Sequence, residues 1–499
     1  MGITNLLPAL SSVEHKVTLC GSKHFQIKEC QGNRNESNGS SGTQRRNIRI
    51  GVDISSWIAA ACHSNTELID ERHFSNFGRN ELTTIANADD PSSQEDLHQQ
   101  QLARNFISTA TKSVLRRIKS IQSCLSPDLI VVLDGGSPPI KKATVDSRKQ
   151  LRANAAQQRD ELVSHHNTRA SGKSAGKNKN DAHGGIGNTL DARSHLSNHQ
   201  KISAAKRAGA TSRIIYSALV DSIFHILREK QIAFLVAPYE ADGQLAIMNN
   251  QSLIDYVISE DSDLIPYGCN ACLYKLKTFM TIGDESDEAY QNCRGTAILL
   301  RKQDLTAVTS TSFNLYGFTD VMITCMCIAS GCDYAKSLKG IGLVSANSAV
   351  REAFETKKSP MSPLEILFGI LFHKCHGKVN DDEKGSYTVS FIEALICFRH
   401  PVVFDGSACV FSNINSPDEQ LMEFAPYAEI VNSHNIGHSN KRLESIVGEL
   451  YPKELCSYVV QGVIDPKTWE IRNKNDDNPQ RVQDCLQEWI HGKDIESGN

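Results

Sequence analysis

The chain has 499 residues, with 53 Lys and Arg against 57 Asp and Glu, which gives a formal net charge of −4. This length allows two or three domains, and 40% hydrophobic with 22% charged residues is the usual composition of a globular protein. A net charge so close to zero excludes a histone-like or ribosomal protein, although it leaves local charged patches open.

The sequence contains no run of about 18 apolar residues, so no membrane-spanning segment is predicted. Its 15 cysteines are scattered, which is typical of free thiols in a reducing compartment. Cys269 and Cys272 are spaced like a zinc-binding pair, but they lack a second pair or a nearby His. We therefore interpret that spacing as chance.

Five short apolar runs, rich in β-branched residues, predict buried strands. They are residues 48–54, 128–134, 232–237, 255–260 and 271–276. Amphipathic patterns predict helices over residues 102–121, 213–230 and 241–249. Strands that alternate with helices predict an α/β fold with a mostly parallel central sheet flanked by helices.

Three polar segments interrupt this pattern. Residues 31–46 are predicted to be a loop insertion, residues 70–101 an irregular segment, and residues 164–201 a disordered or mobile loop. After about residue 310 the chain is predicted to be helical.

Acidic residues follow the predicted strands. Asp53 and Asp134 end the first two strands, and further acids follow the third and fourth strands, namely Glu240, Asp242, Asp261 and Asp263. A single Asp at a strand end is commonly a helix cap or a turn residue. Because the carboxyl ends of parallel strands meet at one edge of a sheet, four such strands bring these acids together. Glu260 is out of phase with Asp261 and Asp263, so we expect it to face away.

Carboxylates gathered this closely repel one another unless a cation neutralises them. Oxygen ligands suit Mg²⁺ or Mn²⁺ better than zinc. More than four acids predict two ions about 4 Å apart, the arrangement that promotes phosphodiester hydrolysis.

Four motifs in order then resemble the flap endonuclease/XPG superfamily of structure-specific 5′ nucleases, and most closely its exonuclease-one branch. They are Met1-Gly2-Ile3-Thr4-Asn5-Leu6-Leu7-Pro8, residues 236–246 around Tyr239-Glu240-Ala241-Asp242, Ser259-Glu260-Asp261-Ser262-Asp263-Leu264, and Ser330-Gly331-Cys332-Asp333-Tyr334 with the Gly340 turn behind it. The resemblance covers about residues 1–20, 48–62, 128–160 and 205–405. It implies a PIN-like nuclease core, a helical arch, and a C-terminal helix–two-turn–helix region.

The resemblance also implies seven metal ligands, which are Asp53, Asp134, Glu240, Asp242, Asp261, Asp263 and Asp333. Asp333 is the ligand that the strand-end pattern does not find. The implied reaction is hydrolysis of DNA near a 5′ end or a junction between single and double strands. Two Mg²⁺ ions, for which Mn²⁺ substitutes, activate water and stabilise the leaving 3′ oxygen.

We expect five regions along the chain. They are an N-terminal nuclease region over 1–160 with insertions at about 21–46 and 65–100, a low-complexity arch insertion over 161–204, an internal nuclease region over 205–310, a helical DNA-binding region over 311–465, and a polar tail over 466–499.

Residues 141–230 are strongly basic, with 17 Lys and Arg against seven acids. Such a run is commonly a solvated surface, but directly after Asp134 it is suited to grip phosphates. The resemblance places Lys141 and Arg148, which share one helix face, at the scissile phosphate. We also expect DNA contacts from Gly2, Lys142 and Arg152.

The turn Lys339-Gly340-Ile341-Gly342 between predicted helices lets the backbone approach a phosphate. By itself a Gly-x-Gly turn between helices is common. The resemblance implies DNA contacts at Gly340 and Gly342 and a K⁺ site formed by Ser330, Ser337 and Ile341.

One position departs from the family pattern, because Ala59 stands where a base-stacking aromatic or His is usual. Trp57 or His63 on the same helix are the substitutes. In the tail, Gln483, Leu486, Trp489 and Ile490 resemble a sliding-clamp-binding box, although an ordinary amphipathic helix is the simpler interpretation.

The sequence thus predicts a metal-dependent 5′→3′ double-strand DNA exonuclease with 5′-flap endonuclease activity. Its expected partners are DNA with 5′ ends, nicks, gaps or flaps, together with mismatch-repair proteins or a sliding clamp. The expected location is the nucleus. The alternatives are a dedicated flap or bubble endonuclease of the same superfamily and a non-catalytic scaffold that binds DNA junctions.

Overall fold

The computed structural model describes residues 3–20, 28–29, 48–64, 94–124, 128–147, 150, 213–279, 294–356, 359–375, 378–406, 410–413, 418–432 and 441–472. Contacts divide the chain into two compact units. The first comprises Met1–Ser56, Leu115–Thr144 and Ile226–Asn499, and the second comprises Trp57–Val114 and Val145–His225.

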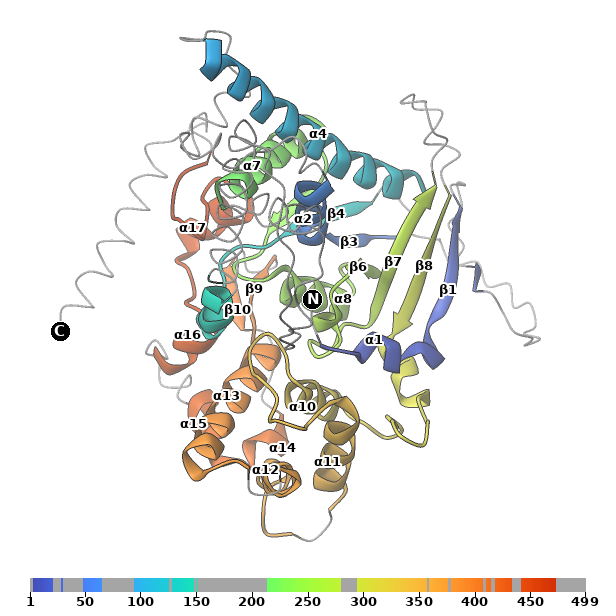
Figure 1. Ribbon diagram of the computed structural model, residues 1–499, viewed down its shortest axis with the longest axis vertical. Coiled ribbons are helices and arrows are strands. Elements are labelled where there is room, and N and C mark those ends of the chain that lie inside the picture. Colours follow the sequence, from blue (N-terminus) through green and yellow to red (C-terminus); the bar gives the residue numbers. More distant parts are fainter. Residues whose placement is uncertain are drawn as a thin grey trace, which may run out of the picture. The chain divides into compact units, whose positions relative to one another are not determined.

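The first unit is built on an eight-stranded sheet, counted over the described residues, with the order β2-β1-β8-β7-β6-β3-β4-β5. The strands are β1 (His15–Cys20), β2 (Lys28–Glu29), β3 (Ile50–Asp53), β4 (Leu129–Leu133), β5 (Phe234–Val236), β6 (Tyr256–Ile258), β7 (Ala271–Phe279) and β8 (Arg294–Arg301). The run β7-β6-β3-β4-β5 is parallel, whereas β8, β1 and β2 add antiparallel strands at one edge. In Figure 1 the N-terminal strand β1 lies beside β8.

Each predicted strand forms, and together they make the parallel part of the sheet. All four residues of β3 are buried, as expected for a parallel strand that is covered on both faces. The expectation of a mostly parallel sheet flanked by helices is therefore confirmed. The antiparallel edge was not predicted.

The predicted helices also form, with longer boundaries in one case. They are α4 (Gln94–Cys124), α7 (Arg213–Glu229) and α8 (Ala241–Asn250). The expectation that residues 70–101 are irregular is wrong for residues 94–101, which are the first turns of α4. Polar residues with high helix propensity can form the first turns of a helix whose apolar face begins later in the sequence. The predicted loops at 31–46 and 164–201 lie outside the described residues.

The helical region predicted after residue 310 is present. Its helices are α10 (Asp320–Ser330), α11 (Leu343–Glu355), α12 (Pro363–Lys374), α13 (Asp381–Arg399), α14 (Glu419–Met422), α15 (Ala425–Asn432), α16 (Lys441–Val447) and α17 (Lys453–Val460). Capping boxes at Ser362 and Asn380 satisfy the first N–H groups of α12 and α13. A hairpin of β9 (Val402–Asp405) and β10 (Val410–Asn413) interrupts this helical region and was not predicted.

Short elements complete the first unit. They are α1 (Leu6–Ala9) and the 3₁₀ turns η1 (Ser11–Val13), η4 (Pro139–Lys141), η6 (Ser262–Leu264) and η7 (Lys302–Ala307). One hydrophobic core runs from Ile3 through the sheet and α10–α13 to Ile464.

The second unit contains parts of α2 (Ser55–Ser64), α4 and α7. Within it, Thr111 of α4 donates a hydrogen bond to Ser222 of α7 at 3.1 Å. No helix among the described residues is long and apolar enough to cross a membrane.

Candidate active site

The predicted acids follow four neighbouring strands of the sheet, in the order β6-β3-β4-β5. Asp53 is the last residue of β3, Asp134 follows β4, and Glu240 is the residue before α8 after β5. Asp261 and Asp263 follow β6. Because these strands are parallel, all five carboxylates lie at the same edge of the sheet.

Asp53 is buried, with 6% of its surface exposed. The Ser55 N–H donates to its Oδ1 at 2.8 Å, and the Ser259 hydroxyl donates to its Oδ2 at 3.1 Å. Burial, and then the charge of Asp134, raise the pKa of Asp53 to about 7. The two hydrogen bonds fix the orientation of this carboxylate.

Asp134 and Asp261 each use one carboxylate oxygen to cap a helical segment. The Ala241 N–H donates to Oδ1 of Asp134 at 2.9 Å, and the Asp263 N–H donates to Oδ1 of Asp261 at 3.1 Å. The local capping role considered for an Asp at a strand end is real for Asp261, the N-cap of η6, whereas Asp134 accepts from the first N–H of a helix that is distant in sequence. Each of these hydrogen bonds also fixes its side chain at the acidic edge.

Asp242 and Asp263 each have a buried Oδ1 without a hydrogen-bond partner. Burial, followed by the charge of Asp261, raises the pKa of both groups well above the ordinary value. A buried carboxylate oxygen without a donor is costly unless a proton or a cation satisfies it. The residues present therefore fit a hard cation at this edge.

Lys141, the last residue of η4, lies between two predicted ligands. Its ammonium donates to Oε1 of Glu240 and lies 3.0 Å from Oδ2 of Asp333, and these side chains are 13–15% exposed. Burial alone lowers the pKa of Lys141, but the charges of Glu240 and Asp333 outweigh it and raise the pKa. Lys141 is thus a permanent cation inside the acid cluster.

Over the described ranges, no three His, Cys, Asp or Glu side chains are already arranged to hold one metal ion. Both Glu240 oxygens are engaged, since Tyr334 donates to Oε2. Each oxygen accepts one hydrogen bond and keeps a lone pair, so a cation at Oε1 would lie beside the Lys141 ammonium and compete with its charge.

Three side chains that were not among the predicted site residues organise this edge. Ser259 donates to Asp53 and accepts from the Asp261 N–H at 3.1 Å. Tyr334 donates to Glu240, and the Tyr267 and Tyr334 hydroxyls are 2.7 Å apart. Ser259 and Tyr334 adjoin the predicted acids in sequence, whereas no local signal marks Tyr267.

The chain's first described residues also reach the site. The Ile3 N–H donates to the Ser262 hydroxyl, between Asp261 and Asp263, at 2.8 Å. Gly2 lies outside the described residues, as do Arg148 and Arg152.

The remaining predicted positions differ in how far their side chains are exposed. Lys142 is exposed, and Glu260 is exposed as expected. Trp57 is 3% exposed, and its stacking on a base stays a prediction. The side chain of His63 and the clamp-like motif at 483–490 lie outside the described part of the chain.

The predicted turn between helices connects α10 to α11. Gly340 has a φ of +92°, a conformation that favours glycine, and Gly342 is the N-cap of α11. Ser330 donates to the Cys327 carbonyl at 2.9 Å, and Ile341 is 5% exposed. Ser337 is exposed on the segment between Ser330 and Ile341. The K⁺ site remains a prediction.

Cys269 and Cys272 are both buried free thiols. The Cys269 thiol donates to Oδ1 of Asn249 at 3.3 Å. Both residues therefore have packing roles in the core.

Comparison with known proteins gives a family match. The model of the XPG I-region matches residues 231–333, a range that begins before β5 and ends at Asp333. It includes five of the predicted ligands, namely Glu240, Asp242, Asp261, Asp263 and Asp333.

Two relatives illustrate the similarity in sequence. Exonuclease 1 of Oryza sativa subsp. japonica is 27% identical over 266 residues, which are 53% of this chain and 25% of the relative. The DNA damage-inducible protein DIN7 of Saccharomyces cerevisiae is 31% identical over 244 residues, 46% of this chain and 51% of the relative. The chain thus spans about a quarter to half of the length of these relatives.

Among solved structures, the catalytic core of Rad2 in complex with DNA substrate is similar, with a TM-score of 0.38 and 14% identity over 89% of this chain and 98% of that chain. The chain therefore contains an XPG I-region over residues 231–333, and in sequence it is similar to exonuclease 1 relatives.

Proposed function

We propose that the chain is a metal-dependent 5′→3′ double-strand DNA exonuclease that also cleaves 5′ flaps. The main support is the meeting of acids from four adjacent parallel strands at one edge, within and beside the XPG I-region match. The similarity to exonuclease 1 relatives supports the same activity.

Seven acids are the proposed ligands of two Mg²⁺ or Mn²⁺ ions, with Asp242 and Asp263 offering oxygens that lack a hydrogen-bond donor. When bound, such ions activate water and stabilise charge on the leaving oxygen. The chain itself contributes fixed carboxylate directions. Ser259 holds Asp53, and the first N–H of α8 holds Asp134.

Lys141 and Arg148 are the proposed contacts to the scissile phosphate. Lys141 is already at the acidic edge, where its charge balances Glu240 and Asp333. A phosphodiester brings its own negative charge, so Lys141 can exchange a carboxylate for a phosphate oxygen without losing an ionic partner.

DNA binding by the turn between α10 and α11 is a second part of the proposal. Gly340 and Gly342 are exposed there, which allows a phosphate to approach the backbone N–H groups at the start of α11. Gly2, Lys142 and Arg152 are the other proposed DNA contacts, and Ser330, Ser337 and Ile341 the proposed K⁺ site. A nuclear location and binding to mismatch-repair proteins or a sliding clamp belong to the proposal as well.

One cleavage assay tests the activity and separates its alternatives. Nicked, gapped, flapped and bubble duplexes, each labelled at either the 5′ or the 3′ end, are incubated with the full chain and Mg²⁺. Stepwise release of nucleotides from the 5′ end of a nick supports the exonuclease. Cleavage confined to flaps or bubbles favours the dedicated endonuclease, and tight junction binding without cleavage in Mg²⁺ or Mn²⁺ favours the scaffold.

A further inference from the structure

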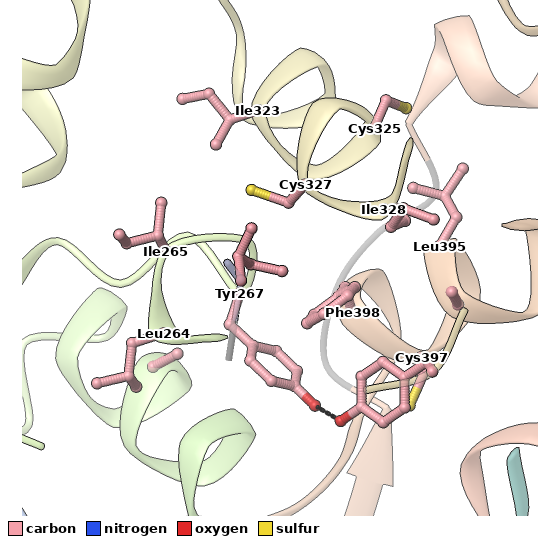
Figure 2. Close-up of a cluster of buried hydrophobic side chains, with 14 of the residues drawn as sticks. Leu264, Ile265, Tyr267, Ile323, Cys325, Cys327, Ile328, Leu395, Cys397 and Phe398 are labelled. Atoms are coloured by element: carbon pink, nitrogen blue, oxygen red, sulfur yellow. Dashed lines mark hydrogen bonds between the residues drawn. The ribbon is translucent and has the colours of Figure 1, made fainter. Parts of the chain in front are cut away.

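The rings of Tyr267 and Tyr334 are buried beside the acidic edge, and each packs edge-on against Phe398 with centroids 4.9 Å apart. Figure 2 shows Tyr267 next to Phe398, with a dashed line from its hydroxyl. The two hydroxyl oxygens are 2.7 Å apart, and the Tyr334 hydroxyl also contacts Oε2 of Glu240.

The direction of this hydrogen-bonded chain follows from counting protons. The Tyr334 hydroxyl has a single proton, and it is donated to Oε2 of Glu240. Tyr334 then has only lone pairs for its neighbour, and Tyr267 must be the donor between the two hydroxyls. Hydrogen bonds in such a series polarise and strengthen one another.

This series of hydrogen bonds, from Tyr267 through Tyr334 to Glu240, connects three segments that carry predicted ligands. Tyr334 directly follows Asp333, and the Tyr267 N–H donates to the Asp263 carbonyl at 3.3 Å. Glu240, the acceptor, is the residue before α8. A shift of any one of these segments therefore stretches a hydrogen bond in the series.

Gly243 of α8 provides the space for Tyr267. A Cβ at Gly243 would lie 3.3 Å from Cε1 of Tyr267 and 3.2 Å from Cβ of Pro401. This is tighter than ordinary contact, so a larger residue would press against the tyrosine.

The two carboxylate oxygens of Glu240 have different hydrogen-bond donors, which suggests a role for the tyrosines. Tyr334, which is buried, donates to Oε2, while Oε1 accepts from Lys141. We propose that Tyr334, held by Tyr267, is a positioning residue that keeps Oε1 of Glu240 directed at the metal site. This inference rests on the proposed function.

The test compares three matched Tyr→Phe variants of the full chain. Tyr334→Phe removes the donor to Glu240, and Tyr267→Phe removes the second link. Tyr387→Phe is the control, because its buried hydroxyl has no hydrogen-bond partner. Mn²⁺ affinity is measured by electron paramagnetic resonance of the free ion, and cleavage of a 5′-flap duplex gives kcat and KM.

Tyr334→Phe is expected to weaken Mn²⁺ binding about tenfold, the effect of losing a hydrogen bond to a charged group. It should lower kcat with KM for DNA unchanged, since DNA contacts are not altered. Tyr267→Phe should have a smaller effect in the same direction. The double variant should match Tyr334→Phe, because Tyr267 acts only through Tyr334.

Unchanged or tighter Mn²⁺ binding by Tyr334→Phe would overturn the inference, as would additive effects in the double variant or an equal loss in Tyr387→Phe. If Tyr334→Phe does not fold, the smaller loss in Tyr267→Phe decides the question. A wild-type chain that binds Mn²⁺ without cleaving DNA contradicts the proposed function, while the Mn²⁺ affinities still decide the positioning role. A wild-type chain that binds no Mn²⁺ overturns both.

Discussion

The ammonium nitrogen of Lys141 lies 3.0 Å from Oδ2 of Asp333. A divalent cation and this ammonium therefore compete for the negative charge of Asp333. They also compete for Glu240, the second partner of Lys141. The residue proposed to hold the phosphate is also a competitor of the metal.

The first prediction follows from this competition. Lys141→Met keeps the apolar stem and removes the charge. In the wild type, Mn²⁺ has to displace a charge-assisted hydrogen bond of Lys141, so the variant should bind Mn²⁺ about tenfold more tightly. Cleavage should nevertheless fall about hundredfold or more, as when one donor to a developing charge is removed. Calorimetric titration with Mn²⁺ and single-turnover cleavage measure the two effects.

Lys142→Met is the matched control, because Lys142 is the exposed neighbour on the chain. Its Mn²⁺ affinity should equal that of the wild type, even if DNA binding weakens. Weaker Mn²⁺ binding in Lys141→Met would contradict the competition.

The second prediction concerns Asp261. Asp261→Asn retains an oxygen to accept from the Asp263 N–H but removes the charge, so it separates metal binding from capping. Cleavage in Mg²⁺ should drop at least about hundredfold, since the lost ligand contributes several kcal/mol of transition-state stabilisation, with an unfolding midpoint close to wild type. Glu260→Gln removes the adjacent exposed charge and should retain cleavage, and equal losses in both variants would remove Asp261 from the site.

The third prediction is a pH dependence of stability without metal. Burial and the charge of Asp134 raise the pKa of Asp53 to about 7 from an ordinary 3.8. The folded state thus holds this proton more tightly than the unfolded state. Its stabilising contribution is full below about pH 4 and is lost as the pH rises through about 7.

In the presence of a chelator, the unfolding midpoint should therefore fall between about pH 5 and pH 8. Added Mg²⁺ should raise it most at the upper end, where the carboxylates are ionised. In Asp53→Asn the decline should be shallower. A midpoint that rises over this range in the metal-free protein would contradict the burial of these acids.

The fourth prediction tests a close contact at the other end of the chain. Gly448 has a φ of +101°, and a Cβ there would overlap the ring of Tyr239, which precedes Glu240. Gly448→Ala should lower the free energy of unfolding by about 2–4 kcal/mol, combining backbone strain with overpacking. Gly340→Ala has similar strain, but no atom lies within 4 Å of its Cβ, so it should cost clearly less in denaturant titrations. Equal losses would mean that the ring moves aside freely.

The sequence predicted the acidic edge because each strand and its acid are adjacent in the chain. Asp53 and Asp134 need only a parallel sheet to come together, and the apolar runs indicated that sheet. Asp333 came from family resemblance alone, since it follows a helix, and its approach to Lys141 is a tertiary contact. Tyr267 had no local signal, because its role depends on a neighbour 67 positions later.

The antiparallel edge was missed for a similar reason. β1 pairs with β8, whose residues lie far along the chain, and a single polar-apolar stretch such as His15–Cys20 does not reveal its partner. Residues 94–101 were assigned as irregular because their composition is polar, although the helix simply begins before its apolar face does.

The strand order has a consequence for synthesis of the protein. β3 lies between β4 and β6, and β1 pairs with β8, which is synthesised much later. The sheet can therefore be completed only after residues up to Arg301 have left the ribosome. Asp333 and Tyr334 follow later still. Contacts this distant in sequence form slowly and leave strand edges open meanwhile. A nascent chain therefore holds its first acids long before it can assemble the acidic edge, which is complete only once the chain has been made as far as Tyr334.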